Sequence, residues 1–477
     1  MSKRVISARP PSHPSAGRRL WSDLRDALRG VQFDYTKERL GRAILLLAVP
    51  MMLEMSMESV FAVVDVFFVM RLGSAAAATV GVTEAMLTLL YAVAIGFSMG
   101  TTAMVARRIG EKDPEAAGSA SVQAIVVGIG IALLVGLLGG FNASALLSIM
   151  GGTPEMVSTG YGYTTVIFAG NVTIFLLFLI NAIFRGAGDA SMAMRSLWLA
   201  NAINIVLDPC LIFGIGPFPE LGLTGAAVAT TTGRGIGVLY QLTILLGGHS
   251  RVVIGRRQLR LQPAVMLALL RVSMFGIFQY LIATSSWVVL VRIISAFGDA
   301  VLAGYTVAIR IIIFAFLPAW GMSNAVATLV GQNLGAGRPE RAERSVWLTS
   351  AYNMAFLGVV GVIFLLFAPA LVGLFTADPA VIAAGVSCLR IVSYGYLFYA
   401  FGIVVVQAFN GAGDTATPMF INLFCFWLLQ IPLAYGLAHP AGLGPIGVFI
   451  AIPVAESVMA VVGGLVFRRG KWKESRL

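Results

Sequence analysis

Charged residues are scarce in this chain. Only 12% of its 477 residues are Asp, Glu, Lys or Arg, whereas 58% are hydrophobic, and the mean hydropathy is +0.88. A water-soluble surface needs about a quarter of the residues of a domain to be charged. The composition therefore excludes an ordinary soluble enzyme, a nucleic-acid-binding protein and a disordered chain, despite a pI near 9.9. It indicates a protein that crosses a membrane several times.

Cysteine and histidine are also rare. The three cysteines all lie within hydrophobic runs, so no disulfide framework is expected, and the three histidines are too scattered for a metal site. These residues are Cys210, Cys388, Cys425, His13, His249 and His439. An intramembrane enzyme would need a nucleophile–base pair or a metal cluster, and no such group is evident. We therefore expect neither an enzyme nor a cofactor. The chain before Leu40 also lacks the apolar core of a cleavable signal peptide.

Hydrophobic runs long enough to cross a membrane recur along the chain. A helix of about 20 residues spans a hydrocarbon core of about 30 Å, and these runs are too long and too uniformly apolar for transmembrane strands. Twelve spans are predicted, centred near residues 57, 92, 132, 170, 202, 235, 280, 316, 360, 397, 427 and 456. The sequence thus predicts an all-α polytopic membrane protein.

The basic residues are distributed unequally between the loops. Of the 33 Lys and Arg residues, 28 fall in the N-terminal tail, in alternate loops or in the C-terminal tail. The opposite loops at residues 141–160, 214–222 and 376–381 contain none. Because basic loops stay in the cytoplasm, we expect both termini to be cytoplasmic.

Three sequence motifs occur twice, and the two copies of each are separated by the same interval. The matched segments are 72–73 with 297–298, 107–117 with 332–342, and 184–189 with 409–414. Three matches at one spacing are not expected by chance, so the chain is predicted to form two lobes of six spans. Since six is even, both lobes have the same topology and are related by a pseudo-two-fold axis along the membrane normal.

The predicted division of the chain follows from this repeat. It consists of a basic N-terminal tail (1–42), an N-lobe (43–247), a basic linker (248–264), a C-lobe (265–468) and a C-terminal tail (469–477). Two lobes around a central cavity favour a transporter that works by alternating access. A duplicated channel is the alternative.

Six acidic residues fall inside the predicted spans. Because a carboxylate at mid-bilayer costs about 2.5 kcal/mol or more, each is expected to face protein or water. They are Glu54, Glu58 and Asp65 in the first span, Glu84 in the second, Asp208 in the fifth and Glu456 in the twelfth. At about 100° per residue, the three acids of the first span share one stripe of the helix. Their mutual repulsion favours protonation of at least one of them, although a structural, hydrogen-bonded carboxyl is the alternative for any single acid.

The fifth span carries a second polar group. Asn204 and Asp208 are four residues apart and share a helix face, and Pro209 removes a backbone donor beside them. This arrangement predicts a proton or cation site. Asp65, Asp208 and Asn204 together could also hold Na⁺.

The repeat acts as an internal control for these acids. The counterparts of Glu54, Glu58 and Asp65 in the second copy are neutral, namely Gln279, Ala283 and Leu290. We therefore predict that ion coupling resides in the N-lobe, whereas Glu84 and Glu456 have no assigned role. The C-lobe is rich in aromatic residues, most of which are expected to pack. Candidates for lining a cavity for flat organic cations are Gln279, Tyr280 and Tyr399.

Together, these motifs resemble those of multidrug and toxic compound extrusion (MATE) transporters. The similar segments extend from about residue 40 to residue 473, and they are Pro50 with Val64-Asp65 and Gly73, Arg185–Asp189, Asn204–Pro209, Gly225–Thr230 and Val330–Gly337. The resemblance implies an antiporter of the bacterial inner membrane that exports organic cations in exchange for H⁺ or Na⁺.

The resemblance is greatest to the proton-coupled, DinF-like branch of that family. It implies that coupling involves Asp65, Asp208, Asn204 and Thr230. The sequence departs from the family pattern at Glu58, where glutamine is usual, and Glu54 is an additional acid. Two second-lobe acids of the Na⁺-coupled branch appear as Ala283 and Tyr399, so a C-lobe cation site is expected to be absent.

The sequence therefore predicts a monomeric secondary antiporter for small cationic or lipophilic drugs, with no nucleic-acid partner. In this hypothesis the N-lobe acids alternate between binding protons and binding the cationic substrate. A lipid-linked oligosaccharide flippase of the same superfamily is the nearest alternative, but its pyrophosphate cargo would favour a cationic cavity. A channel would leak rather than concentrate its substrate.

Overall fold

The computed structural model describes residues 16–31, 33–248 and 250–475, and all regular structure within these ranges is helical. The first half of the chain forms α1 (Ala16–Arg29), α2 (Leu40–Met70), α3 (Ser74–Gly110), α4 (Pro114–Phe141), α5 (Ala143–Ile149), α6 (Pro154–Ala169), α7 (Asn171–Ala187), α8 (Ala190–Phe213) and α9 (Gly222–Leu246). The second half forms α10 (Pro263–Ser295), α11 (Asp299–Gly335), α12 (Pro339–Gly373), α13 (Pro379–Ser393), α14 (Tyr396–Ala412), α15 (Ala416–Asn422), the π-helix η1 (Leu423–Gln430), α16 (Ile431–Ala438), α17 (Pro445–Arg468) and the 3₁₀ turn η2 (Lys471–Glu474).

These helices supply the twelve predicted spans. Ten segments are long and apolar enough to cross a membrane, and the pair α13–α14, bent by 59°, is an eleventh. We assign α9 as the twelfth. It is 25 residues long, but Arg234, Gln241 and several threonines make it less apolar than the other eleven. The predicted fold class is thus confirmed, with one difference. The fourth span of each lobe is broken in the middle, at Gly170 and at Gly395, which occupy equivalent positions of the repeat.

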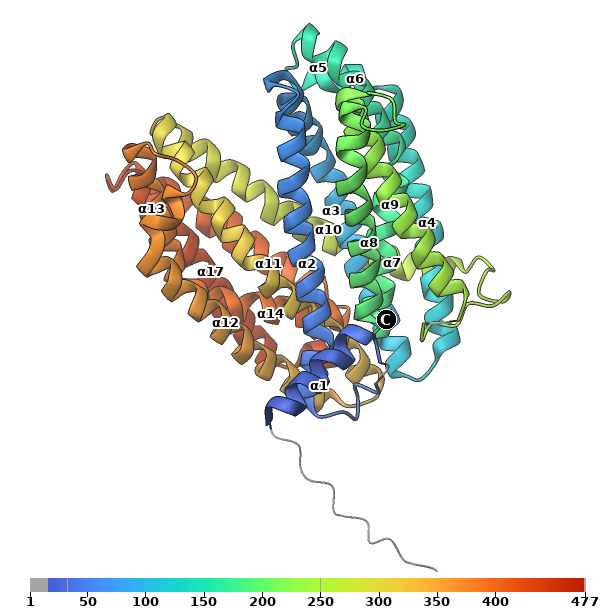
Figure 1. Ribbon diagram of the computed structural model, residues 1–477. Helices are drawn as coiled ribbons and strands as arrows, with labels where there is room; N and C mark the ends of the chain where they lie inside the picture. Colours follow the sequence, from blue (N-terminus) through green and yellow to red (C-terminus); the bar gives the residue numbers. More distant parts are fainter. Residues whose placement is uncertain (1–15, 32, 249, 476–477) are drawn as a thin grey trace, which may run out of the picture.

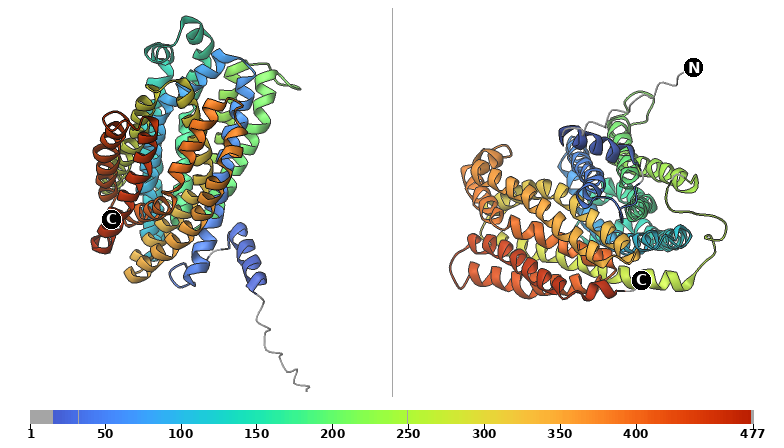
Figure 2. Two further views of the ribbon diagram at one scale, coloured as in Figure 1. Left: turned by 90° about the vertical axis from the view of Figure 1, so that its left-hand side faces the viewer. Right: turned by 90° about the horizontal axis from the view of Figure 1, so that it is seen from below.

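The helices are grouped into two lobes that diverge toward one end of the molecule (Figure 1). The helices α2 to α9 form one lobe, and α10 to α17 form the other. The lobes separate toward the end that carries α5 and α13, and they meet near α1 and the C-terminal end of the chain (Figures 1 and 2). We call this second end the basic side. The lobes meet where α2 and α3 contact α11 and where α3 contacts α10.

Glycines allow the two lobes to approach closely at this contact. A Cβ atom at Gly96 of α3 would lie 2.3 Å from the backbone nitrogen of Ile277 in α10. On the basic side, a Cβ atom at Gly110 would lie 2.1 Å from the carbonyl oxygen of Gln332 in α11. The reciprocal contact is equally close, since a Cβ atom at Gly335 would lie 2.1 Å from the carbonyl oxygen of Arg107. Backbone therefore packs against backbone at this closed end.

Segments at both ends of the chain cross between the lobes on the basic side. The guanidinium of Arg338, just before α12, donates to the carbonyl of Thr36 at 2.8 Å, and that of Arg341 in α12 donates to the carbonyl of Tyr35 at 3.1 Å. Arg107 of α3 donates to the carbonyl of Ser475 at 2.6 Å. Burial raises the pKa of Tyr35 to about 12, so its hydroxyl stays protonated and donates to the carbonyl of Gly188 at 3.1 Å. These bonds join the N-lobe to the C-lobe.

The sequence repeat is also a repeat of backbone conformation. The left-handed residues Gly188 and Gly413, with φ of 86° and 85°, end α7 and α14. Gly73 and Gly298, with φ of 102° and 100°, precede α3 and α11. Each pair occupies equivalent positions of the two copies, which shows why the repeated motifs retain glycine: an L-residue with a side chain adopts positive φ only at a cost.

One position of this repeat departs from glycine. Lys112 has a φ of 60°, whereas its counterpart Gly337 has a φ of 67°. We expect Lys112→Gly to stabilise the protein by about 1 kcal/mol, since it removes left-handed strain from an exposed residue. A rise in Tm of the purified protein would show this. Gly337→Ala is the matched control and should lower the Tm. Its Cβ would meet no heavy atom within 4 Å, so the left-handed backbone alone would be strained. A lower Tm for Lys112→Gly would contradict the prediction.

Candidate functional site

Three polar residues of α8 and α9 form a buried network in the N-lobe. Asp208 is fully buried, and Asn204 and Thr230 are 2% and 9% exposed. The neighbours of Asn204 orient its amide, whose Nδ2 donates to Oδ2 of Asp208 at 2.8 Å while its oxygen accepts from the hydroxyl and backbone N–H of Thr230 at 2.9 Å. The structure therefore brings together three of the residues that the sequence singled out.

The Asp208 carboxyl retains an unused acceptor. Its Oδ1 atom has no hydrogen-bond partner among the described residues. The next residue, Pro209, lies inside α8 and, lacking an N–H, cannot donate to the carbonyl of Ile205 one turn earlier. A buried acceptor without a partner is costly, so this position favours an incoming proton or cation.

Asp65 lies close to this network. It is half-buried on α2, and its carboxyl is near enough to Asp208 for the two charges to interact. It also interacts electrostatically with Glu84 of α3 and Arg234 of α9. The acids of α2, α3 and α8 thus share one region of the N-lobe, and Glu84, which had no role assigned from the sequence, belongs to it.

Arg234 is the functional candidate that the sequence reasoning missed. It is 7% exposed, its Nη1 atom lies 3.5 Å from the hydroxyl of Tyr91, and its guanidinium lies 5.8 Å from the ring centroid of Phe61. It also interacts with the charges of Glu58 and Asp65. An arginine in the middle of a predicted span was the available signal, but the pattern of acids alone does not reveal it.

The two other acids of α2 have separate partners. Glu58 accepts a hydrogen bond from Nδ2 of Asn201 in α8 at 3.2 Å. Glu54 is buried and accepts from Arg185 at 2.8 Å and from Asn181 at 3.0 Å, both in α7. Arg185 is one of the 28 basic residues that we assigned to tails and loops, but its side chain is only 13% exposed and pairs with Glu54. Glu54 is therefore neutralised by a fixed cation, unlike Asp208.

This pairing predicts a large effect on stability. We expect Glu54→Ala to destabilise the protein by about 3 kcal/mol or more, because it leaves Arg185 buried without its counter-ion. The double variant Glu54→Ala/Arg185→Met is expected to recover most of the loss, since replacing a buried ion pair with apolar groups is often neutral. Thermal unfolding of the purified variants measures both effects. Equal Tm values for Glu54→Ala and the parent protein would refute a stabilising pair.

The predicted C-lobe residues lie on α10 and α14, and Tyr280 interacts electrostatically with Tyr91, the partner of Arg234. Gln279 is buried on α10 and Tyr280 is half-buried beside it. Tyr399 of α14 accepts a hydrogen bond from Nε1 of Trp320 at 2.6 Å and stacks on Phe316 with ring centroids 4.1 Å apart. Among the described residues no hydrogen bond joins Tyr399 to the α10 pair. These contacts are those of packed aromatic residues.

Two further features bear on the choice of site. Glu456 of α17 is 7% exposed, and one of its carboxyl oxygens lacks a hydrogen-bond partner within the described ranges.

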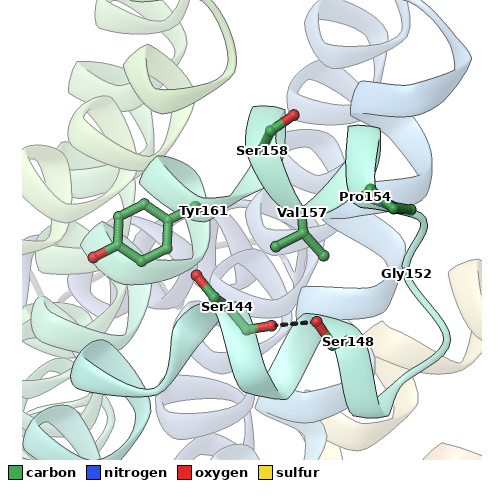
Figure 3. Close-up of a pocket in the computed structure, with 7 residues that line it drawn as sticks. All are labelled: Ser144, Ser148, Gly152, Pro154, Val157, Ser158 and Tyr161. Carbon is green, nitrogen blue, oxygen red and sulfur yellow. Dashed lines mark hydrogen bonds between the residues drawn. The ribbon is translucent and has the colours of Figure 1, made fainter.

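An open pocket also lies between α5 and α6 at the end away from the basic side (Figure 3). Its lining is formed by Ser144, Ser148, Gly152, Pro154, Val157, Ser158 and Tyr161. This lining includes no acid and none of the polar residues described above. Across the described part of the chain, no cluster of three or more His, Cys, Asp or Glu residues could hold a metal ion.

Comparison with known proteins decides the family. The family model described as MatE matches residues 50–210 and residues 276–436 of the chain. This chain belongs to the MatE family. The two matches fall on the two copies of the internal repeat. The predicted family is thereby confirmed, whereas the DinF-like branch stays a prediction.

The individual relatives cover nearly the whole chain. It is 28% identical to a probable multidrug resistance protein NorM of Thermotoga maritima over 91% of this chain and 93% of the relative. It is 24% identical to an FAD transporter of Shewanella oneidensis over 88% and 92%. Among solved structures, an outward-facing multidrug resistance MATE transporter of the MOP superfamily superposes with a TM-score of 0.86 at 27% identity, over 94% of this chain and 99% of that one.

Proposed function

We propose that this protein is a secondary antiporter of the bacterial inner membrane that exports organic cations in exchange for protons. Its basic side faces the cytoplasm, as the distribution of Lys and Arg predicts, and both termini lie there. One observation carries the proposal: Asp208 is fully buried and has an acceptor without a partner among the described residues, beside Asn204 and close to Asp65. Relatives named as multidrug resistance proteins support the substrate class.

The coupling follows from the cost of an unpaired buried carboxylate. A charged Asp208 in an apolar interior is unfavourable, and binding either a proton or an organic cation neutralises it. Because both ligands use the same carboxyls, Asp65 and Asp208, occupancy by one excludes the other. Exchange then occurs as the lobes open alternately to the two sides of the membrane. In this proposal, the close backbone contact on the basic side is that of an outward-facing state.

The assignment to the proton-coupled, DinF-like branch belongs to the same proposal. Na⁺ is the alternative coupling ion, since hard cations take carboxylate and amide oxygens such as those of Asp65, Asp208 and Asn204. The neutral residues Ala283 and Tyr399 in the C-lobe leave the N-lobe as the coupling site in either case. A flippase for a pyrophosphate-linked cargo is disfavoured, because most of the charge in this region is acidic.

Reconstituted protein tests the proposal. Proteoliposomes receive a pH gradient or, separately, a sodium gradient, and the movement of a fluorescent organic cation against its own concentration gradient is followed. We expect accumulation with the pH gradient and none with the sodium gradient. Accumulation with sodium alone would refute proton coupling, and downhill movement only would identify a channel.

Arg234 provides a test of cavity electrostatics. A like charge about 8 Å away at an effective dielectric of 20 disfavours a bound monovalent cation by about 2 kcal/mol. We therefore expect Arg234→Gln to strengthen dye binding by about ten- to thirty-fold in Kd. Equilibrium binding of a cationic dye to the purified protein measures the change. Arg234→Lys is the control and should retain the affinity of the parent protein. Weaker binding by Arg234→Gln would show that Arg234 holds the site together instead.

A further inference from the structure

The helix α1 lies outside the two lobes on the basic side (Figures 1 and 2). Its sequence gives it three distinct edges, which are apolar, acidic and basic. At about 100° per residue, Leu20, Trp21, Leu24 and Leu28 fall within an arc of about 100°. Three of them are unusually exposed for large hydrophobic residues, namely Leu20 at 50%, Trp21 at 73% and Leu28 at 39%. The described residues do not cover this apolar stripe, which is separate from the transport site.

The second edge of α1 is acidic and is attached to the bundle. Arg42 of α2 bonds to Asp23 at 2.8 Å and to Asp26 at 3.1 Å. Arg195 of α8 donates to the carbonyl of Leu28 at 2.7 Å. These contacts hold α1 in one orientation, so the apolar stripe is turned away from the protein.

The third edge is basic. Arg25 and Arg29 are both exposed and lie on the other flank of the apolar stripe, about 140° and 180° from Leu20 on the helical wheel. A helix that combines an apolar stripe with neighbouring arginines binds at the boundary between acyl chains and anionic head groups. A short connection follows Arg29 before α2 begins at Leu40 and enters the membrane, so α1 lies near the surface of the same bilayer.

We propose that α1 docks on the anionic lipid surface of the leaflet at the basic side, with its leucines and Trp21 in the acyl boundary and Arg25 and Arg29 on lipid phosphates. The occupant is lipid rather than a protein because the stripe is tethered beside a membrane span and its flank matches the charge of anionic head groups. The inference does not depend on the transported substrate or the coupling ion.

Spin labels on the full-length protein in lipid nanodiscs test this docking. One label is placed at Leu28→Cys on the apolar stripe and one at Ser22→Cys, an exposed position of the same helix about 120° away. We expect the Leu28 label to be accessible to oxygen and shielded from a water-soluble nickel chelate, and the Ser22 label to show the reverse. The parent protein, whose three cysteines lie within spans, controls for background labelling.

A charge variant distinguishes docking that depends on anionic head groups from docking that depends on the apolar stripe alone. Arg25→Gln/Arg29→Gln should lower the oxygen-to-nickel accessibility ratio at position 28 by about two-fold or more in nanodiscs with anionic lipid, and zwitterionic lipid alone should do the same for the parent. Equal exposure of both labels to water would overturn the proposal. A Leu28 label shielded from both reagents would also overturn it, because protein would then cover the stripe. Size-exclusion profiles and Tm values show whether each variant is folded.

Discussion

Asp208→Asn is expected to abolish proton-driven export while leaving the protein folded. The substitution is nearly isosteric, and the amide oxygen can still accept from Nδ2 of Asn204, as Oδ2 of Asp208 does now. It cannot bind and release a proton, however, and it carries no charge for an organic cation. We expect export driven by a pH gradient to fall at least ten-fold, to the level of protein-free liposomes.

Glu456→Gln is the matched control for this variant. Glu456 is also a buried acid with an oxygen that lacks a partner among the described residues, but it lies on α17 of the C-lobe. It should retain most of the export activity, because the proposal assigns coupling to the N-lobe. Undiminished export by Asp208→Asn, or an equal loss in both variants, would contradict that assignment.

Gly110→Val is expected to stop transport by a different route. A side chain at this position would place Cβ 2.1 Å from the carbonyl oxygen of Gln332, so the closed contact between α3 and α11 could not form. The protein should lose the state in which the basic side is closed, and export should fall to background. Spin labels on the exposed residues Lys112 and Glu340, one in each lobe, should report a longer distance between the lobes on this side.

Gly81→Val serves as the control, because it lies on the same helix and its Cβ would meet no heavy atom within 4 Å. It places the same β-branched residue in α3 without the clash, so transport and the inter-lobe distance should be unchanged. If Gly110→Val transports normally, the close backbone contact is not required for the cycle. If both variants fail alike, the effect comes from valine in α3 and not from the contact.

Much of the architecture could be predicted because it depends on local patterns. Hydrophobic runs locate the spans, and the motif that contains Gly188 recurs around Gly413 because α7 and α14 both end at a left-handed residue. The proximity of Asn204 to Asp208 follows from their spacing on one helix. The breaks at Gly170 and Gly395 were not predicted, since a broken span has the same mean hydropathy as a straight one.

The partners of the acids could not be predicted from spacing. Glu54 and Arg185 are 131 residues apart and meet only because the folded lobe brings their side chains on α2 and α7 within reach of each other. Arg234 joins the acids of α2 and α3 from α9 for the same reason. Helix periodicity shows which residues share a face, but the neighbour of that face depends on how the helices pack. The sequence therefore predicted most of the acids of the site, but not the arginines Arg185 and Arg234 that offset their charge.

The central claim is that protons and organic cations compete for the same N-lobe carboxyls. Proton release on substrate binding tests it most directly. Purified protein in weakly buffered detergent solution is mixed with a saturating organic cation, and a pH indicator records the protons released. The account predicts release of about one proton per bound cation, and none from the variant Asp65→Asn/Asp208→Asn. Cation binding without proton release, or unchanged release from that variant, would contradict it.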